Sequence, residues 1–237
     1  MAVQIIAHRG ASYLANHENT IEAFQLAIDT HAEYVEFDVR QTLDKQLIIF
    51  HNEQINGMAV ASLTYQEINQ FAQKQGYQIP LFSDVLALCK DRIKLDIEIK
   101  EPGFEKRLLA MLKEQVSYDS FMIKSFLDIV VLRVKKMDSQ VTTGLLLGVE
   151  QTTLQNRFNE YFPKRRIEHC MADFISPNYR LATPEFLFRM KKAHIPVYVW
   201  TVNSPKTIKH FLEQPVAGII TDRPDVAVYF RRLLQTN

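Results

Sequence analysis

Cysteine is scarce in this chain, and the only two, Cys89 and Cys170, stand far apart. Neither belongs to a C-x-x-C or Cys/His spacing, so we expect two reduced, mostly buried thiols and no zinc or thiol redox site. Net charge is also nearly absent, because 28 lysines and arginines face 27 aspartates and glutamates. No net field would attract nucleic acid or an anionic membrane, and we expect a small-molecule partner. The oligomeric state stays open.

Long apolar runs are missing as well. Nowhere do eighteen apolar residues follow one another, which excludes a spanning helix on length. The short apolar run from Val3 to Ala7 has no basic residue before it and ends at once in His8-Arg9-Gly10, too short for the core of a secretory signal. We therefore expect no stable membrane insertion and a cytoplasmic location.

The chain also lacks linkers rich in glycine, serine or proline, low-complexity tracts and long runs of one charge. Its apolar residues make up 47% and its charged residues 23%, as in an ordinary globular protein. The 237 residues suit one α/β barrel, and we expect a single domain over residues 1–237.

Short β-branched or aromatic runs alternate with segments of helical period, a pattern typical of βαβ units and a parallel sheet. We predict an α/β fold, a (β/α)₈ TIM barrel with a short insertion after His51. The strand candidates are Gln4–His8, Tyr34–Val39, Gln46–His51, Lys94–Lys100, Phe121–Ser125, Thr143–Leu147, Asp173–Ser176, Val197–Thr201 and Gly218–Thr221. These are nine candidates for eight barrel places. Because Asp44-Lys45 is a plausible tight turn, Gln46–His51 is either a barrel strand or the return arm of a local hairpin.

Helix starts are marked by capping residues. Asn19 with Glu22 three residues later resembles a capping box. Thr183 and Ser204 each precede a proline, which is the pattern of an N-cap followed by proline at the first helical position. We expect helices to begin at these three places.

Two of the predicted strands carry charges where a covered parallel strand should be apolar. In Val35–Val39 a period of two places Glu36 and Asp38 on one face, and in Leu95–Lys100 it places Asp96, Glu98 and Lys100 on one face. A half-exposed antiparallel strand would show the same alternation. The flanking helices favour covered strands instead, so we expect the charges to point into the barrel.

Unpaired charges inside a barrel would cost several kcal/mol each, roughly, so they must neutralise one another or hold a cation. Glu36, Asp38 and Glu98 offer hard oxygen ligands, which suit Mg²⁺ or Ca²⁺ better than zinc. We predict one divalent cation on these three residues. Lys100 lies one pleat repeat beyond Glu98, where it could hold an anionic ligand.

Further candidate site residues stand at the ends of predicted strands, where barrel enzymes keep their chemistry. His8 and His51 could divide general acid and general base work, because the unperturbed pKa of histidine is near neutrality. The planar guanidinium of Arg9 matches two phosphate oxygens. Trp200 either fills the core or forms a wall for the organic part of a substrate.

Taken in order, several motifs of this chain resemble those of the glycerophosphodiester phosphodiesterase family, which belongs to the phosphatidylinositol-phospholipase-C-like barrel enzymes. These motifs are His8-Arg9-Gly10, Glu18-Asn19-Thr20, Glu36-Phe37-Asp38-Val39, Ile49-Phe50-His51, Asp96-Ile97-Glu98-Ile99-Lys100, Ser125-Phe126, Trp200-Thr201-Val202-Asn203 and Thr221-Asp222-Arg223-Pro224. The resemblance runs from residue 5 to residue 224 and implies hydrolysis of a glycerophosphodiester to glycerol 3-phosphate and an alcohol. It implies that Glu36, Asp38 and Glu98 hold the cation, that His8 and His51 exchange protons, and that Arg9 and Lys100 bind phosphate.

The chain departs from the family pattern after the second histidine, where Asn52 replaces the usual aspartate. The segment 52–79 is also shorter than usual and lacks an Arg-Thr-Thr-rich stretch, which leaves the alcohol head group open. Two other functions remain as alternatives. A barrel lyase or isomerase would use Mg²⁺, strand-borne carboxylates and a lysine base, and a noncatalytic barrel would bind phosphodiesters without cleaving them.

Overall fold

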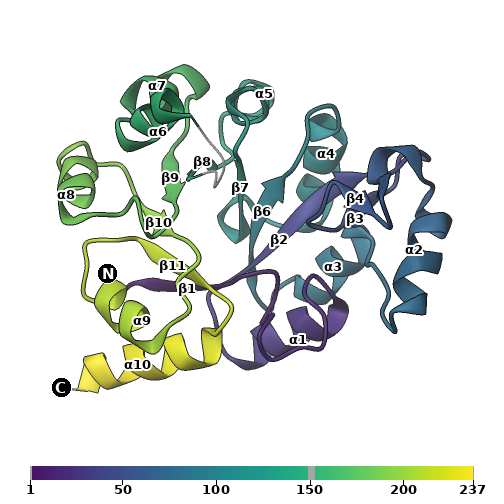
Figure 1. The fold of residues 1–237 in the computed structure, drawn as a ribbon, viewed down its shortest axis with the longest axis horizontal. Coiled ribbons are helices and arrows are strands. Elements are labelled where there is room, and N and C mark those ends of the chain that lie inside the picture. Colours follow the sequence, from purple (N-terminus) through teal and green to yellow (C-terminus); the bar gives the residue numbers. More distant parts are fainter. Residues whose placement is uncertain (1, 149–152, 237) are drawn as a thin grey trace.

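The computed structural model describes residues 2–148 and 153–236, and its centre is a ring of parallel strands (Figure 1). The strand order is β10-β11-β1-β2-β6-β7-β8-β9, and parallel bridges from Ile175 to Val197 and from Asn178 to Trp200 connect β9 with β10. These strands are β1 (Gln4–Ala7), β2 (Tyr34–Gln41), β6 (Lys94–Ile99), β7 (Phe121–Ser125), β8 (Thr143–Leu147), β9 (Phe174–Pro177), β10 (Tyr198–Val199) and β11 (Gly218–Thr221). Eight parallel strands thus form a nearly closed barrel, which confirms the predicted fold class.

Helices surround the strands on the outside, as Figure 1 shows. They are α1 (Ile21–Asp29), α3 (Phe82–Cys89), α4 (Glu105–Gln115), α5 (Asp128–Met137), α6 (Leu154–Tyr161), α7 (Lys164–Cys170), α8 (Pro184–Lys192), α9 (Pro205–Leu212) and α10 (Pro224–Thr236). A short 3₁₀ turn, η2 (Tyr118–Ser120), leads into β7. Within the described ranges, no helix combines the length and the apolar character that crossing a membrane requires.

The ninth strand candidate is not a barrel strand. It forms β3 (Leu47–Ile49), which pairs antiparallel with the end of β2. In this pairing Val39 lies opposite Ile49, and Gln41 lies opposite Leu47. Lys45, in the turn between them, has a φ of 65°, which is compatible with a tight hairpin turn. The hairpin alternative is therefore correct, and His51 follows the return arm of this hairpin, not a barrel strand.

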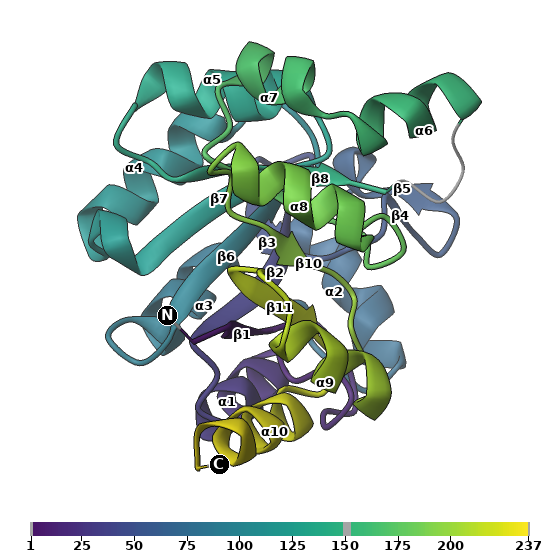
Figure 2. The same ribbon diagram turned by 90° about the vertical axis from the view of Figure 1, so that its left-hand side faces the viewer.

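The insertion after His51 packs against β3 and has its own apolar core. It contains β4 (Gln54–Ile55), β5 (Met58–Ala59), the 3₁₀ turn η1 (Val60–Ser62) and α2 (Tyr65–Lys74). Its buried cluster joins Ile48 of β3 to Ile55, Val60, Leu63, Ile68, Ala72 and Ile79. In Figure 1 this segment lies at the right, outside the ring of helices and next to the end of β2, and in Figure 2 it lies behind the barrel, on the side away from the viewer.

Two of the three predicted helix starts are confirmed. The hydroxyl of Thr183 accepts the N–H of Phe186 at the start of α8, and Ser204 does the same for Thr207 in α9. The third prediction is wrong by one residue, because Thr20 caps α1 and Asn19 has a φ of 56° outside the helix. The side chain of Asn19 is used elsewhere, as described below.

The barrel interior divides into an apolar part and a charged part. One buried apolar cluster consists of Ile6, Tyr34, Met122, Phe174 and Ile220. Side chains two residues further along each strand lie on the same, inward face. Two residues further on in β2 stands Glu36, and two residues further on in β7 stands Lys124. The apolar cluster thus fills the barrel on the side of the amino ends of the strands, while the charged side chains lie toward the carboxyl ends.

Candidate active site

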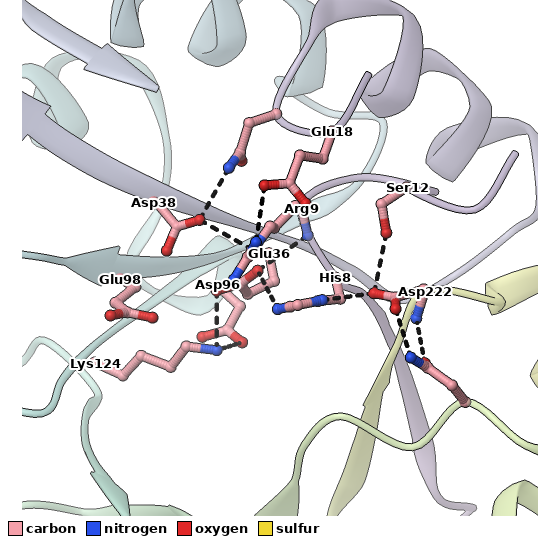
Figure 3. Close-up of polar contacts among 12 residues, drawn as sticks. His8, Arg9, Ser12, Glu18, Glu36, Asp38, Asp96, Glu98, Lys124 and Asp222 are labelled. Carbon is pink, nitrogen blue, oxygen red and sulfur yellow. Dashed lines mark hydrogen bonds and ion pairs between the residues drawn. The ribbon is translucent and has the colours of Figure 1, made fainter. Parts of the chain in front are cut away.

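Three buried carboxylates meet at the carboxyl ends of β2 and β6 (Figure 3). Glu36, Asp38 and Glu98 each offer a carboxylate oxygen, and the three oxygens lie within 4.8 Å of one another. Their exposed fractions are 2%, 1% and 7%. The parallel register pairs Asp38 with Glu98, and the period of two brings Glu36 to the same face. The predicted inward orientation of these charges is confirmed, and the antiparallel, half-exposed alternative is wrong.

Two cations flank the carboxylates. The Nζ of Lys100 is 2.6 Å from Oε1 of Glu98 and 3.3 Å from Oδ1 of Asp38. Arg9 approaches Asp38 from the other side, with its Nε 3.4 Å from Oδ2, and it also pairs with Glu18. Asn19 donates its amide N–H to the same Oδ2 of Asp38 at 2.9 Å. Asp38 is therefore held by groups from three separate segments of the chain.

The pKa values of the carboxylates reflect this crowding. Burial raises the pKa of Asp38, but the charges of Lys100 and Arg9 outweigh burial and hold that pKa well below its usual range. For Glu98 burial prevails over Lys100 and raises the pKa to about 7. Glu98 therefore holds its proton more readily than an exposed glutamate, because burial outweighs the ammonium beside it. All three donors are hard carboxylate oxygens, so the residues present fit a divalent cation of the Mg²⁺ or Ca²⁺ type.

His8 stands immediately after β1 and joins the two ends of the chain. Its Nδ1 lies 2.6 Å from Oδ1 of Asp222, the residue after β11, and its Nε2 lies 4.0 Å from Oε2 of Glu36. Asp222 also accepts hydrogen bonds from Ser12 and from the amide of Asn203. Burial lowers the pKa of His8, but the bond to Asp222 and the charge of Glu36 outweigh it and raise that pKa above 6.5.

Sequence reasoning missed the role of Asp222. Its only signal was its place in the Thr221–Pro224 motif, directly after the last strand.

His51 reaches the same cavity from the loop after β3. Its backbone carbonyl accepts two N–H groups of Arg40, at 3.1 Å from Nε and 3.0 Å from Nη2, and Arg40 also pairs with Glu101. The ring Nδ1 is 3.0 Å from Oδ1 of Asn52. Burial lowers the pKa of His51, against the opposing charge of Asp38. The two histidines thus have pKa values shifted in opposite directions.

A second buried ion pair lies beside the carboxylates, and sequence reasoning missed its cationic member. Lys124 of β7 is 2% exposed, and its Nζ lies 2.6 Å from Oδ2 of Asp96 and 3.5 Å from Oε1 of Glu36. Burial lowers the pKa of Lys124, but the two carboxylates outweigh burial and raise it above its ordinary value, so the ammonium stays charged. In the sequence, Lys124 was an isolated charge in an apolar strand with no motif to mark it.

These side chains surround a cavity of about 730 Å³. Its lining includes His8, Arg9, His51, Lys100 and Trp200. The indole N–H of Trp200 donates to the carbonyl of Ser176 at 2.7 Å, and the ring meets Phe126 edge to face. Trp200 lines this cavity and also packs against the apolar cluster of the barrel interior. All eight predicted site residues therefore come together at one end of the barrel, with Asp38 in contact with Arg9 and Lys100.

Comparison with known proteins places the whole chain in one family. The model of the "Glycerophosphoryl diester phosphodiesterase family" matches residues 8–226. A glycerophosphodiester phosphodiesterase of Caldanaerobacter subterraneus is 31% identical over 249 residues, which cover 96% of this chain and 97% of that protein.

Solved structures agree in fold. A glycerophosphodiester phosphodiesterase from Parabacteroides distasonis has a TM-score of 0.81 at 21% identity and covers 99% of this chain and 98% of its own. A phosphodiesterase from Oleispira antarctica, solved in complex with the product sn-glycerol-3-phosphate, has a TM-score of 0.82 at 20% identity and covers 97% and 96%. With the site at the carboxyl ends of the strands and the family match over nearly the whole length, this chain belongs to the glycerophosphoryl diester phosphodiesterase family and is an enzyme of that class.

Proposed function

We propose that this phosphodiesterase hydrolyses a glycerophosphodiester to glycerol 3-phosphate and an alcohol, using one divalent cation held by Glu36, Asp38 and Glu98. The observation that carries the proposal is the buried carboxylate trio, whose oxygens lie within 4.8 Å of one another beside two basic side chains. The glycerol phosphate bound to the Oleispira antarctica phosphodiesterase supports the same product here. Membership of the family argues against a barrel lyase or isomerase and against a noncatalytic barrel.

Charge balance supports the cation. Glu36, Asp38 and Glu98 carry three negative charges when all are ionised, and the permanent cations that contact Asp38 and Glu98 are Arg9 and Lys100. Arg9 is shared with Glu18, and Lys124 is shared between Glu36 and Asp96. A divalent cation on the trio would add positive charge beside the carboxylates, which favours binding of a phosphodiester anion. When bound, the cation would supply electrostatic stabilisation of the charge that develops on phosphate oxygens.

The two histidines are proposed to move the protons. With its pKa raised, His8 tends to carry a proton, and with its pKa lowered, His51 tends to be neutral. A pair of groups with pKa values shifted apart is suited to separate acid and base roles. We assign His8 as the group that protonates the leaving alcohol and His51 as the group that takes a proton from the nucleophile, with the roles exchanged in a second step.

Arg9, Lys100 and Trp200 are proposed to bind the substrate. Arg9 and Lys100 both line the cavity, and each has further N–H groups besides those that contact carboxylates. Trp200 would border the organic part of the diester. The head group is expected to depend on the segment 52–79 and on Asn52, whose side-chain oxygen contacts His51.

The nucleophile is proposed to be the glycerol hydroxyl next to the phosphate ester. Attack within the substrate gains much of the entropic advantage of an intramolecular reaction, and water would open the resulting cyclic phosphate. Replacing that hydroxyl by hydrogen separates this route from direct attack by water. A deoxy analogue that binds but is not cleaved supports the cyclic route; cleavage at a similar kcat shows direct attack.

The function itself is tested by a screen of glycerophosphodiesters with Mg²⁺ and with Ca²⁺. The protein is first freed of metal, and free glycerol 3-phosphate is the readout. We expect release of glycerol 3-phosphate from at least one diester in the presence of one of the two ions. Metal binding without release of glycerol 3-phosphate from any diester would overturn the proposed reaction.

A further inference from the structure

Lys124 is a lysine in an unusual place. It lies on β7 in register with Glu98 of β6, so its side chain points into the barrel, where it is 2% exposed. A buried ammonium needs anionic partners, because its desolvation costs several kcal/mol, roughly, if it is left alone. It has two such partners, Asp96 at 2.6 Å and Glu36 at 3.5 Å. Figure 3 shows Lys124 reaching toward Asp96 beside the carboxylate trio.

Asp96 is a fourth carboxylate on the inner face of these two strands. It precedes Glu98 by one pleat repeat, is paired in register with Glu36, and is fully buried. Asp96 is nevertheless not part of the possible ion site. Among the described residues, the acids whose oxygens lie close enough together to hold one ion are Glu36, Asp38 and Glu98. Asp96 turns one oxygen to Lys124 instead. The lysine therefore neutralises the carboxylate that the trio does not use.

Lys124 also limits how Glu36 can be oriented. Oε2 of Glu36 accepts the backbone N–H of Arg9 at 3.0 Å, while Oε1 faces Lys124. The carboxylate is thus held from two sides, by the backbone N–H of Arg9 in the loop after β1 and by the ammonium of Lys124 on β7. Groups that fix a metal ligand in this way commonly influence metal affinity strongly although they do not touch the ion.

We propose that Lys124 and Asp96 form a positioning pair for the metal centre, in which Lys124 orients Glu36 and keeps Asp96 out of the ligand set. The inference rests on the proposed function, since it takes Glu36, Asp38 and Glu98 as the ligands. In this arrangement the centre binds its ion with three carboxylates and not four. Lys124 also lines the cavity, and in this role it acts through Glu36 and Asp96.

The test removes the pair without changing the net charge. In the double variant Asp96→Asn/Lys124→Met one negative and one positive charge disappear together, so a change in metal affinity reflects orientation more than total charge. Mg²⁺ alone and Ca²⁺ alone are titrated into metal-free protein by calorimetry. We expect binding to weaken by about 10- to 100-fold, the range seen when groups that support metal ligands are lost.

A control variant removes an ion pair outside the cavity. Lys135 of α5 and Asp173, which precedes β9, form an ion pair at 2.7 Å, and Lys135→Met/Asp173→Asn makes the same two kinds of substitution at this more exposed pair. We expect this control to lower the thermal unfolding midpoint of the metal-free protein while its metal affinity stays within about twofold of wild type. A purely structural role for Lys124 and Asp96 would give the double variant this same behaviour and would overturn the proposal.

If the methionine variant does not fold, Asp96→Asn/Lys124→Gln takes its place. The shorter amide can pair with the amide at position 96 but loses its reach toward Glu36, so weaker metal binding is again expected. Wild-type affinity in this variant overturns the positioning role. Failure of the wild-type protein to bind either ion would overturn the proposed metal centre itself, which keeps the two failures distinct.

Discussion

His8 and Asp222 are separated by 214 residues in the chain, and Nδ1 of His8 lies 2.6 Å from Oδ1 of Asp222. The contact forms because β1 and β11 are neighbouring parallel strands, with Ala7 paired to Thr221, so the residues that follow them leave the sheet side by side. The carboxylate fixes the imidazole and stabilises its protonated form. The other ring nitrogen is left facing Glu36 and the cavity.

Asp222→Asn is expected to lower kcat by about 10²-fold, because His8 loses both its orientation and the charge that favours its protonated form. The KM for a glycerophosphodiester should change much less. Ser12→Ala, which removes another hydrogen bond to Asp222 and leaves the pair intact, is the matched control and should retain most activity. Steady-state kinetics check both variants, and a similar kcat for Asp222→Asn and wild type would show that His8 does not need this partner.

Asp222 should also contribute to the pH dependence of stability. Burial raises the pKa of Asp222, but the hydrogen bond and charge of His8 outweigh it and lower the pKa below 3.8. A carboxyl with a lowered folded-state pKa stabilises the fold above its unfolded pKa, and this contribution is lost as the pH falls through the folded value.

In metal-free buffer, urea unfolding from pH 6 down to pH 2 should therefore show a shallower loss of stability for Asp222→Asn than for wild type. His8 acts in the opposite sense. Its raised pKa gives stability below about pH 6.5 that is lost as the pH rises through the folded value. If the free energy of unfolding fell equally steeply between pH 6 and pH 2 for the variant and for wild type, the lowered pKa of Asp222 would be contradicted.

Removal of divalent ions should abolish turnover, because the buried carboxylate trio lacks sufficient positive charge without them. Glu36→Gln and Glu98→Gln should each weaken Mg²⁺ or Ca²⁺ binding measured by calorimetry. Glu33→Gln is the control, since Glu33 precedes β2 at the opposite end of the barrel and pairs with Arg231. Full activity after exhaustive EDTA treatment, with metal content verified as nil, would exclude a metal requirement.

His8→Ala and His51→Ala should each lower kcat by about 10²- to 10⁴-fold, the range for loss of a general acid or base. The exposed His194 provides the control variant His194→Ala, which should be fully active. Circular dichroism establishes that each variant is folded before its kinetics are compared. A loss below about tenfold for either site histidine would remove that residue from the proposed proton transfer.

Gly144→Ala should destabilise the fold through the barrel interior. A Cβ at position 144 would lie 2.1 Å from a carbon of the Phe174 ring, a buried aromatic side chain of the apolar cluster. Overpacking of this kind costs about 1–3 kcal/mol. Urea unfolding measures the loss, and adding Phe174→Leu should recover part of it by making room. Wild-type stability for Gly144→Ala alone would show that the ring moves at little cost.

Local patterns in the sequence were sufficient for much of the fold and for the buried carboxylate trio. The alternation in Val35–Val39 and Leu95–Lys100 identified inward carboxylates because a strand has a period of two that does not depend on the rest of the chain. Thr183 and Ser204 marked helix starts for a similar reason, since an N-cap bonds within its own first turn. Patterns of this range can be read without knowing what the segment packs against.

Contacts between distant segments were decided only in three dimensions. Whether Gln46–His51 runs parallel or antiparallel to its neighbour depended on its pairing with β2. Asn19 was expected to cap a helix, because no neighbouring residue in the sequence indicates its hydrogen bond to Asp38. Lys124 meets Asp96 across 28 residues, and His8 meets Asp222 across 214. For such pairs, the separation along the chain does not predict the distance in space. The closure of the barrel determines which strand ends are neighbours, and therefore which charged side chains share the site.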